Sequence, residues 1–236
     1  SAHSLTVVAA IAREIGAGGG WISFASFMEM ALYQPGLGYY SAGARKFGAA
    51  GDFVTAPEMT AYFGRALARQ VAQLMAASAP HVLEVGAGSG RLAADLLLEL
   101  ERLDALPERY DILDLSADLR ERQQATLAAA APHLLARVRW LDRLPEAFSG
   151  AVVANELLDA MPAHVVAWRE DGIFERGVGL DGSGGFTWNE RPATGALLVA
   201  AEELGRQCCL PPGYESEISL AARAWAGEWG HRLQRG

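Results

Sequence analysis

The stretch His81-Val-Leu-Glu-Val-Gly-Ala-Gly-Ser-Gly90 decides the fold. It begins as a short apolar strand that contains one acid, Glu84, and then breaks into three alternating glycines. A run of leucines at helical spacing follows at once. The glycines let the backbone approach a ligand closely, and a helix N-terminus presents unpaired N–H groups. The stretch therefore predicts a nucleotide-binding α/β unit, although an ordinary α/β turn with Glu84 at a solvated strand end has the same pattern.

The residues around the glycines distinguish two classes of cofactor. A dinucleotide dehydrogenase usually reads G-x-G-x-x-G, which requires glycine at the position where this chain has Arg91. Such an enzyme also keeps the strand before the first glycine apolar, which Glu84 does not fit. An acid ahead of G-x-G-x-G, here Gly86, Gly88 and Gly90, resembles the first motif of class I S-adenosylmethionine (SAM) methyltransferases. In that motif the acid lies near the methionine end of the cofactor. A nicotinamide oxidoreductase is the less favoured alternative.

A second acid ends the next expected strand, Tyr110–Asp114, and lies twenty-four residues beyond Gly90. A carboxylate at the end of the second strand can hold a nucleoside ribose, because it can accept hydrogen bonds from both hydroxyls. Asp114 as a simple turn residue is the alternative, and its register with the three glycines favours the cofactor contact. Ser116 is expected to cap the following helix, which carries Leu119, Arg120, Gln123 and Leu127.

The fourth expected strand, Ala151–Ala154, runs directly into Asn155-Glu-Leu-Leu-Asp-Ala-Met-Pro162. The carboxyl ends of parallel strands are where such sheets place their chemistry. Glu156 and Asp159 are three residues apart, so they share a face if the segment is a helical turn. The alternative is a helix capped by Asn155 and followed by acids that the helix dipole favours.

We expect four segments within one compact domain. They are an N-terminal helical extension over 1–78, a SAM-binding core over 79–162, an antiparallel β insertion over 163–213 and a helix over 214–236 that returns to the core. A third core strand is expected over Val138–Leu141. Alternating apolar residues and the hairpin signal Asp171-Gly172 indicate the insertion. The last helix is expected from about Ser216 to Leu233.

A glycine-flanked acid, Asp52, precedes a helix that is expected from Ala56 to about Ala77. Thr55 and Glu58 have the spacing of a capping box at the start of this helix. Capping accounts for these two residues but not for Asp52. If the helix packs on the sheet, the loop that carries Asp52 lies beside the glycine turn, and we therefore add Asp52 to the expected cofactor contacts.

Composition limits the partners. The 236 residues are 51% hydrophobic and 20% charged, which predicts a packed soluble core. A formal net charge of −8, without a Lys/Arg block, disfavours nucleic acid as a partner. No apolar run has the length of a membrane span and no signal-peptide pattern is seen, so no membrane association is expected. Adjacent Cys208 and Cys209 fit free thiols in a reducing cytoplasm, or in mitochondria in a eukaryote, and the histidines lack the spacing of a metal site.

Five motifs occur together and in order: Ile22–Met28, Ala31–Tyr40, Gly51–Glu58, Glu84–Gly90 and Asn155–Pro162. Together they resemble the MidA-like family of SAM-dependent methyltransferases, relatives of the mitochondrial complex I assembly factor that methylates a protein arginine. The resemblance implies an α/β fold of the class I, Rossmann-like type with SAM as cofactor. Asp114 departs from the family, which tends to carry glutamate there. The family also continues past a position like Gly236 into further strands, so we expect the C-terminal strands of the sheet to be missing here.

The resemblance further implies methyl transfer to a guanidino nitrogen of a protein arginine, with a complex I subunit as one candidate substrate. Because a guanidinium stays protonated, its nitrogens are poor nucleophiles, and a carboxylate that binds it in bidentate fashion localises charge away from the attacking nitrogen. Glu156 is the expected clamp, with Asp159 assisting and Asn155 orienting substrate or cofactor. Glu84 would then hold the methionine end of SAM and Asp114 the ribose.

A second function remains open: a SAM-binding assembly factor with little turnover, for which contacts with a partner matter most. The aromatic residues of the β-rich stretch Val165–Trp188 would then form its binding surface. Base methylation of nucleic acid is disfavoured, because Asn155-Glu156 is not followed by the Pro-Pro-aromatic loop of such enzymes.

Overall fold

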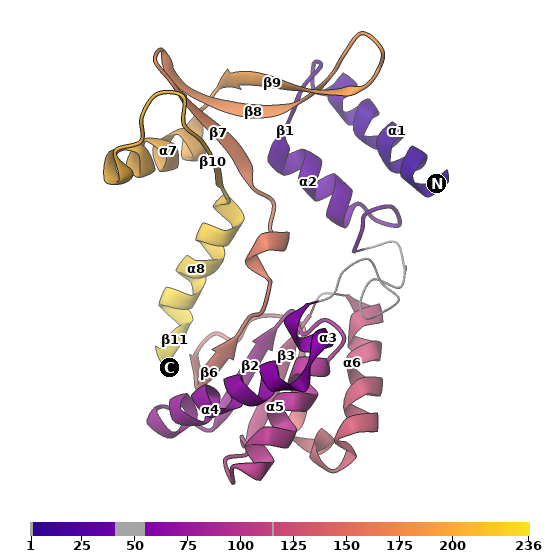
Figure 1. Ribbon diagram of the computed structural model, residues 1–236, viewed down its shortest axis with the longest axis vertical. Coiled ribbons are helices and arrows are strands. Elements are labelled where there is room, and N and C mark those ends of the chain that lie inside the picture. Colours follow the sequence, from indigo (N-terminus) through magenta and orange to yellow (C-terminus); the bar gives the residue numbers. More distant parts are fainter. Residues whose placement is uncertain (1, 41–54, 115) are drawn as a thin grey trace. The chain divides into compact units, whose positions relative to one another are not determined.

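The computed structural model describes residues 2–40, 55–114 and 116–236. The chain forms two compact units, each assembled from two stretches of sequence: 1–43 with 158–226, and 44–157 with 227–236 (Figure 1). The units do not follow the four segments or the one compact domain expected from the sequence. The reason is strand pairing, because β1 (Ile22–Ser23) of the expected N-terminal extension pairs with β8 (Gly172–Leu180) of the expected insertion.

The unit that contains residues 44–157 is built on a parallel four-stranded sheet of order β4-β3-β2-β6. The strands are β2 (His81–Val85), β3 (Arg109–Leu113), β4 (Val138–Leu141) and β6 (Ala151–Val153). The strand order reverses between β2 and β6, which places a topological switch point beside β2, where α/β sheets bind ligands. This sheet confirms the expected α/β class. A short parallel pair, β5 (Phe148–Ser149) with β11 (Leu233–Arg235), completes the strands described in this unit.

Helices pack on one face of this sheet (Figure 1). They are α4 (Ala61–Ala77), α5 (Arg91–Arg102) and α6 (Ala117–Ala130), with a short α3 (Ala56–Met59) before them and a 3-10 turn η1 (Pro132–Arg137) after them. Alternate strand residues such as Val82, Tyr110 and Ile112 are fully buried against the helices. Apolar burial of this kind contributes about 25 cal/mol per Å² and stabilises the platform on which the polar strand ends rest.

The helix expected over residues 56–77 is broken at Thr60. Thr60 is extended, with φ −161° and ψ 141°, and its side chain accepts a hydrogen bond from the Tyr62 backbone N–H as the cap of α4. Met59, the last residue of α3, is 73% exposed. The expected continuous helix is wrong at this position, because a capping threonine starts a second helix.

The other unit is built on an antiparallel sheet of order β1-β8-β7-β10, with β9 paired to β8. Its further strands are β7 (His164–Arg169), β9 (Phe186–Pro192) and β10 (Glu215–Ile218). The expected hairpin is confirmed, since β7 and β8 pair from Arg169 and Gly172 outward. The helices are α1 (Ala2–Ala17), α2 (Phe24–Tyr33) and α7 (Gly195–Cys208), with the 3-10 turn η2 (Leu158–Ala160). The helix α8 (Leu220–Arg232) begins in this unit, and its residues from 227 onward belong to the unit of the parallel sheet.

Two expectations about this unit are wrong. The last helix does not begin at Ser216, because residues 215–218 form the edge strand β10 against β7 and Ser219 caps α8 through its Oγ. The stretch 163–213 is not wholly β structure either, since α7 lies within it and buries Leu197, Ala200 and Ala201 against Val166 and Trp168 of β7. Cys208 and Cys209 at the end of α7 are free and exposed, as expected.

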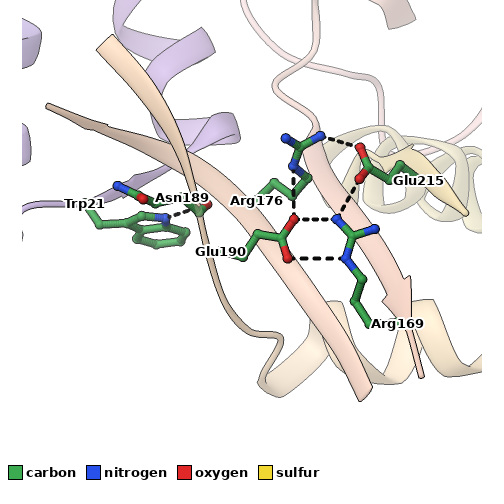
Figure 2. A network of polar contacts seen from close by, with 6 residues as sticks. All are labelled: Trp21, Arg169, Arg176, Asn189, Glu190 and Glu215. Carbon is green, nitrogen blue, oxygen red and sulfur yellow. Dashed lines mark hydrogen bonds and ion pairs between the residues drawn. The ribbon is translucent and has the colours of Figure 1, made fainter. Parts of the chain in front are cut away.

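Two arginines and two glutamates join four strands of the antiparallel sheet (Figure 2). Arg169 Nη2 on β7 lies 2.5 Å from Glu190 on β9 and 2.6 Å from Glu215 on β10. Arg176 on β8 pairs with the same two carboxylates. Each charge has two partners of opposite sign, so the network connects the strands rather than forming a ligand site. Partly exposed ion pairs of this kind contribute about 1 kcal/mol or less each.

Candidate functional site

The register of the parallel sheet places the two expected cofactor acids on one face. Glu84 lies opposite Ile112 in the pairing of β2 with β3. Because side chains alternate along a strand, Asp114, two residues beyond Ile112, lies on the same face as Glu84. Both acids stand at the carboxyl ends of their strands, and they are buried, with 2% and 8% exposure.

Glu84 is a buried carboxyl group with one strong partner, the Tyr110 hydroxyl, which donates a hydrogen bond of 2.6 Å. Burial raises the pKa of Glu84, the Tyr110 bond lowers it and the charge of Asp114 raises it, for a value of about 7. The contribution of Asp114 means that the charge of this carboxylate opposes the ionisation of Glu84. A bound cation at this edge would favour the ionised form of Glu84, which is the chemistry that an α-ammonium group requires.

The glycine turn that follows β2 has the backbone that its sequence predicts. Gly86, Gly88 and Gly90 have φ angles of +72°, +55° and +82°, in the left-handed region that glycine favours. A Cβ added at Gly88 would have no heavy atom within 4 Å, so a ligand can approach the backbone there. A Cβ at Gly90 would lie 2.9 Å from the Cα of Gln123, so glycine at this position allows the turn to pack on α6.

A residue of α6 that the sequence interpretation left without a role connects these parts. Gln123 is fully buried, and its Nε2 donates to the Gly88 carbonyl at 3.1 Å and to Asp114 Oδ2 at 2.8 Å. Its Oε1 accepts from Trp140 Nε1 on β4 at 3.0 Å. The sequence feature that could have indicated this role is its spacing. Gln123 is four residues from Leu119 and four from Leu127, which places a polar side chain on the buried face of α6.

Two further residues fix the position of Asp114. The Ser116 backbone N–H donates to Asp114 Oδ1 at 3.0 Å, and Ser116 Oγ caps α6 as expected, by accepting from the Leu119 backbone N–H. Arg120 donates from Nε to the Asp114 carbonyl at 2.7 Å and from Nη2 to the Leu141 carbonyl at 2.5 Å. These hydrogen bonds connect the ends of β3 and β4 to α6, and they fix the backbone that carries the Asp114 carboxylate.

Glu58 does not act in the expected capping box, since Thr55 makes no side-chain cap bond at α3. The Glu58 carboxylate instead accepts a short hydrogen bond from the Ser89 hydroxyl inside the glycine turn. Ser89 Oγ in turn accepts from the Arg91 backbone N–H at 3.3 Å. The motif before α4 thus contacts the glycine turn, as its position suggested, but through Glu58; Asp52 lies outside the described residues.

The polar segment after β6 does not form the single helical turn considered from the sequence. Glu156 is in the left-handed region, with φ +51°, and the 3-10 turn η2 begins two residues later. The shared helical face of Glu156 and Asp159 is therefore wrong, and so is a helix capped by Asn155. Both acids are exposed, whereas Asn155 is half-buried. Glu156 belongs to the unit of the parallel sheet and Asp159 to the other unit.

The turn that carries Asp159 is held by a tyrosine from the Ala31–Tyr40 motif. The Tyr33 hydroxyl donates to the Ala160 carbonyl at 2.7 Å, and its ring stacks on Tyr40 with 5.4 Å between centroids. Burial, Tyr40 and Asp159 together raise the pKa of Tyr33 to about 12, so the hydroxyl stays protonated and remains a donor. This motif therefore has a structural role, which is to position the Leu158–Ala160 turn.

Two kinds of site find no support in the described parts of the chain. No group of three or more His, Cys, Asp or Glu side chains there could hold a metal ion. No helix among those residues has the length and apolar character that a membrane crossing requires.

A comparison with protein families gives the site a context. Residues 64–236 match the model of a family of S-adenosyl-L-methionine-dependent methyltransferases. The chain belongs to this family. The expected MidA-like resemblance is confirmed, and SAM is the cofactor of the family. The residues at the strand ends fit such a cofactor, since a glycine turn that is open at Gly88 follows the strand of the buried Glu84 and is linked through Gln123 to the buried Asp114.

Curated relatives of this chain are named as mitochondrial proteins. It is 29% identical over 218 residues to the protein arginine methyltransferase NDUFAF7 of Danio rerio, covering 80% of this chain and 51% of the relative. Against NDUFAF7 of Homo sapiens the identity is 29% over 183 residues, covering 64% and 41%. The chain thus spans about half the length, or less, of these relatives.

Two crystal structures of COG1565 superfamily proteins from Burkholderia thailandensis are more similar. One, bound to S-adenosyl-homocysteine, has 48% identity and a TM-score of 0.89, covering 100% of this chain and 61% of that one. The other, a native structure, has 46% identity and a TM-score of 0.85, covering 100% and 60%. The agreement confirms the class I methyltransferase fold for this chain.

Proposed function

We propose that the protein is a SAM-dependent protein arginine N-methyltransferase. The observation that carries the proposal is the pair of buried carboxylates, Glu84 and Asp114, on one sheet face beside an open glycine turn. The preference for arginine is supported by the similarity to NDUFAF7 proteins, which are named as arginine methyltransferases. From the resemblance to the MidA-like family we also propose a protein substrate, with a complex I subunit as the first to test, and a location in the bacterial cytoplasm or in mitochondria.

Residues at the ends of two strands would bind different parts of the cofactor. Glu84, in its ionised form, would accept from the ammonium group of the methionine end, and Asp114 would accept from the ribose hydroxyls. The three glycines would let the backbone of the turn pass close to the sulfonium. SAM supplies an already activated methyl group. The contribution of the chain is therefore to bind, orient and exclude water.

The substrate residues would act on the charge of the guanidinium. A carboxylate that accepts two N–H donors from one edge of the guanidinium favours positive charge on those nitrogens, so the third nitrogen keeps more of its lone pair. We assign this clamp to Glu156, with its neighbour Asn155 orienting the substrate or the cofactor. The exposure of Glu156 and its left-handed backbone fit a side chain that meets an incoming macromolecular substrate.

The antiparallel sheet gives little support to the alternative role as a SAM-binding assembly factor. Two of its aromatics are occupied inside their own unit, since Phe186 packs edge-on against Phe27 at 5.5 Å and Trp188 against Phe24 at 5.3 Å. Trp188 also carries Arg176 over its ring at 4.9 Å. These rings are 37% and 48% exposed, so they leave only part of their surface for a partner.

The test separates methyl transfer from SAM binding. Glu156→Gln should lower the rate of methyl transfer by about 100-fold or more and leave the Kd for SAM unchanged, because only the charge that faces the substrate is removed. Glu146→Gln, an exposed glutamate of the same unit, is the matched control. The readout is labelled methyl from SAM, followed by mass spectrometry for methylarginine. Full activity of Glu156→Gln would remove the clamp assignment, and tight SAM binding with no labelled protein would favour the assembly role.

A further inference from the structure

We infer that Gln123 is a positioning residue for the cofactor, which locks the glycine turn to the ribose acid and has its amide orientation set by Trp140. This inference deepens the proposed function and depends on it for the assignment of the turn and of Asp114 to SAM. Every residue that it uses lies in the unit of the parallel sheet.

The amide of Gln123 has all of its partners inside the protein. Its two N–H donors meet two acceptors, the Gly88 carbonyl at 3.1 Å and Asp114 Oδ2 at 2.8 Å. Its oxygen meets the Trp140 indole N–H at 3.0 Å. The side chain is fully buried, so a lost partner is not replaced by bulk water. A completely satisfied buried network of this kind is rigid.

Trp140 decides which way the amide points. An indole nitrogen can only donate, and a carboxylate and a carbonyl can only accept. In the flipped orientation, Oε1 would face the acceptors on Asp114 and Gly88, and the NH₂ group would face the Trp140 donor. All three contacts would become repulsive. The orientation therefore follows from the partners themselves, and Trp140 contributes to the site without needing to touch the ligand.

The position of Gln123 in the fold explains why this residue type is needed. Gly88 is in the turn after β2, Asp114 follows β3, and Trp140 is on β4, so one side chain from α6 reaches three neighbouring strand ends. Its backbone also supports the turn, because a Cβ at Gly90 would lie 2.9 Å from its Cα. An apolar residue at this position could fill the space but could not donate to the turn and the acid together.

The decisive experiment is titration of SAM into the wild type and two variants. Gln123→Met keeps the length and flexibility of the side chain and removes its amide, so we expect the Kd for SAM to rise about tenfold or more. Trp140→Phe keeps an aromatic ring and removes only the indole donor, so the expected rise is smaller, about threefold. Gln124→Leu, an exposed neighbour on α6, should leave the Kd unchanged.

A double-mutant cycle separates positioning from a general loss of structure. If Gln123 acts through Asp114, the Asp114→Ala/Gln123→Met double variant should bind SAM no more than about threefold more weakly than Asp114→Ala alone. A merely structural role predicts that the two losses add. Thermal unfolding of each variant accompanies the titration, and Trp140→Phe decides if Gln123→Met does not fold.

The failures can be told apart. A wild-type protein that does not bind SAM would overturn the proposed function and this inference with it. A wild type that binds SAM and loses binding in Asp114→Ala, while Gln123→Met and Trp140→Phe bind as the wild type does, would overturn the inference alone.

Discussion

The acids at the ends of β2 and β3 and the acids of the Asn155–Pro162 segment are the same chemical groups in opposite surroundings. Glu84 and Asp114 are buried and hydrogen-bonded to Tyr110 and Gln123. Glu156 and Asp159 are exposed; Glu156 has a left-handed backbone and Asp159 lies in the short 3-10 turn η2. A buried carboxylate needs fixed partners, whereas an exposed one stays available to a ligand that arrives with its own charge. The difference fits a preformed cofactor site and a substrate segment that is completed by the substrate.

The largest expected effect concerns Glu84 and tests the difference between the buried and the exposed acids. Its folded pKa of about 7 lies above the ordinary 4.5, so the folded state keeps a proton that the unfolded state loses between these pH values. The stability associated with this proton is fully present below pH 4.5 and is lost as the pH rises through 7. Glu84→Gln should therefore stabilise the free protein at pH 8, by up to about 3 kcal/mol, and weaken SAM binding.

Chemical denaturation at pH 5 and pH 8 measures this effect. The stability difference between Glu84→Gln and the wild type should be large at pH 8 and should shrink at pH 5. Glu156→Gln is the exposed counterpart and should leave the stability unchanged at both values. If the difference in unfolding free energy between Glu84→Gln and the wild type is the same at pH 5 and pH 8, then ionisation of Glu84 does not destabilise the folded protein.

The next prediction compares the stability of alanine variants at two glycines of the same turn, Gly88 and Gly90. Both are left-handed, which costs an alanine about 1 kcal/mol in either place. An alanine at position 90 also meets the Gln123 backbone at 2.9 Å, whereas one at position 88 meets nothing within 4 Å. Gly90→Ala should therefore lose about 2 kcal/mol or more of stability, and Gly88→Ala about 1 kcal/mol.

Calorimetric unfolding and SAM titration on the same samples check this pair. Gly88→Ala should weaken SAM binding more than its small loss of stability suggests, because its methyl group enters the space left open for the ligand. If Gly88→Ala binds SAM as the wild type does, the open side of the turn is not the side that the cofactor meets.

The smallest effect lies in the exposed segment. Tyr33→Phe removes the hydrogen bond to the Ala160 carbonyl, at a cost of at most about 1 kcal/mol. The Leu158–Ala160 turn should become less well fixed, so methyl transfer should slow while the Kd for SAM stays the same. Tyr62→Phe, at a tyrosine that is 73% exposed, is the matched control. A change in SAM affinity without a change in transfer would reverse the roles given to the two regions.

The residues that sequence predicted well are those whose role is local. The first apolar strand and the three glycines are adjacent in the chain, and Asp114 directly follows its own strand, so local backbone preferences are enough to predict these elements. Ser116 was recognised as a cap for the same reason. The parallel order of the strands then follows from the alternation of strands and helices.

The residues that sequence did not predict depend on partners far along the chain. Gln123 gains its role from Gly88 and Trp140, which lie 35 and 17 residues away. Glu58 fitted a local capping box but bonds Ser89 instead. The polar edge strand Glu215–Ile218 lacks an apolar alternation of its own and forms only because β7 supplies a partner.

The most direct test of the account is the Kd for SAM, measured by isothermal titration of the wild type, Asp114→Ala and the exposed control Asp118→Ala. We expect binding by the wild type and by Asp118→Ala, and a rise in Kd of about 100-fold for Asp114→Ala, because two charge-assisted hydrogen bonds to the ribose are lost. An Asp114→Ala protein that binds SAM as tightly as the wild type would contradict the claim that the acids at the ends of β2 and β3 hold the cofactor.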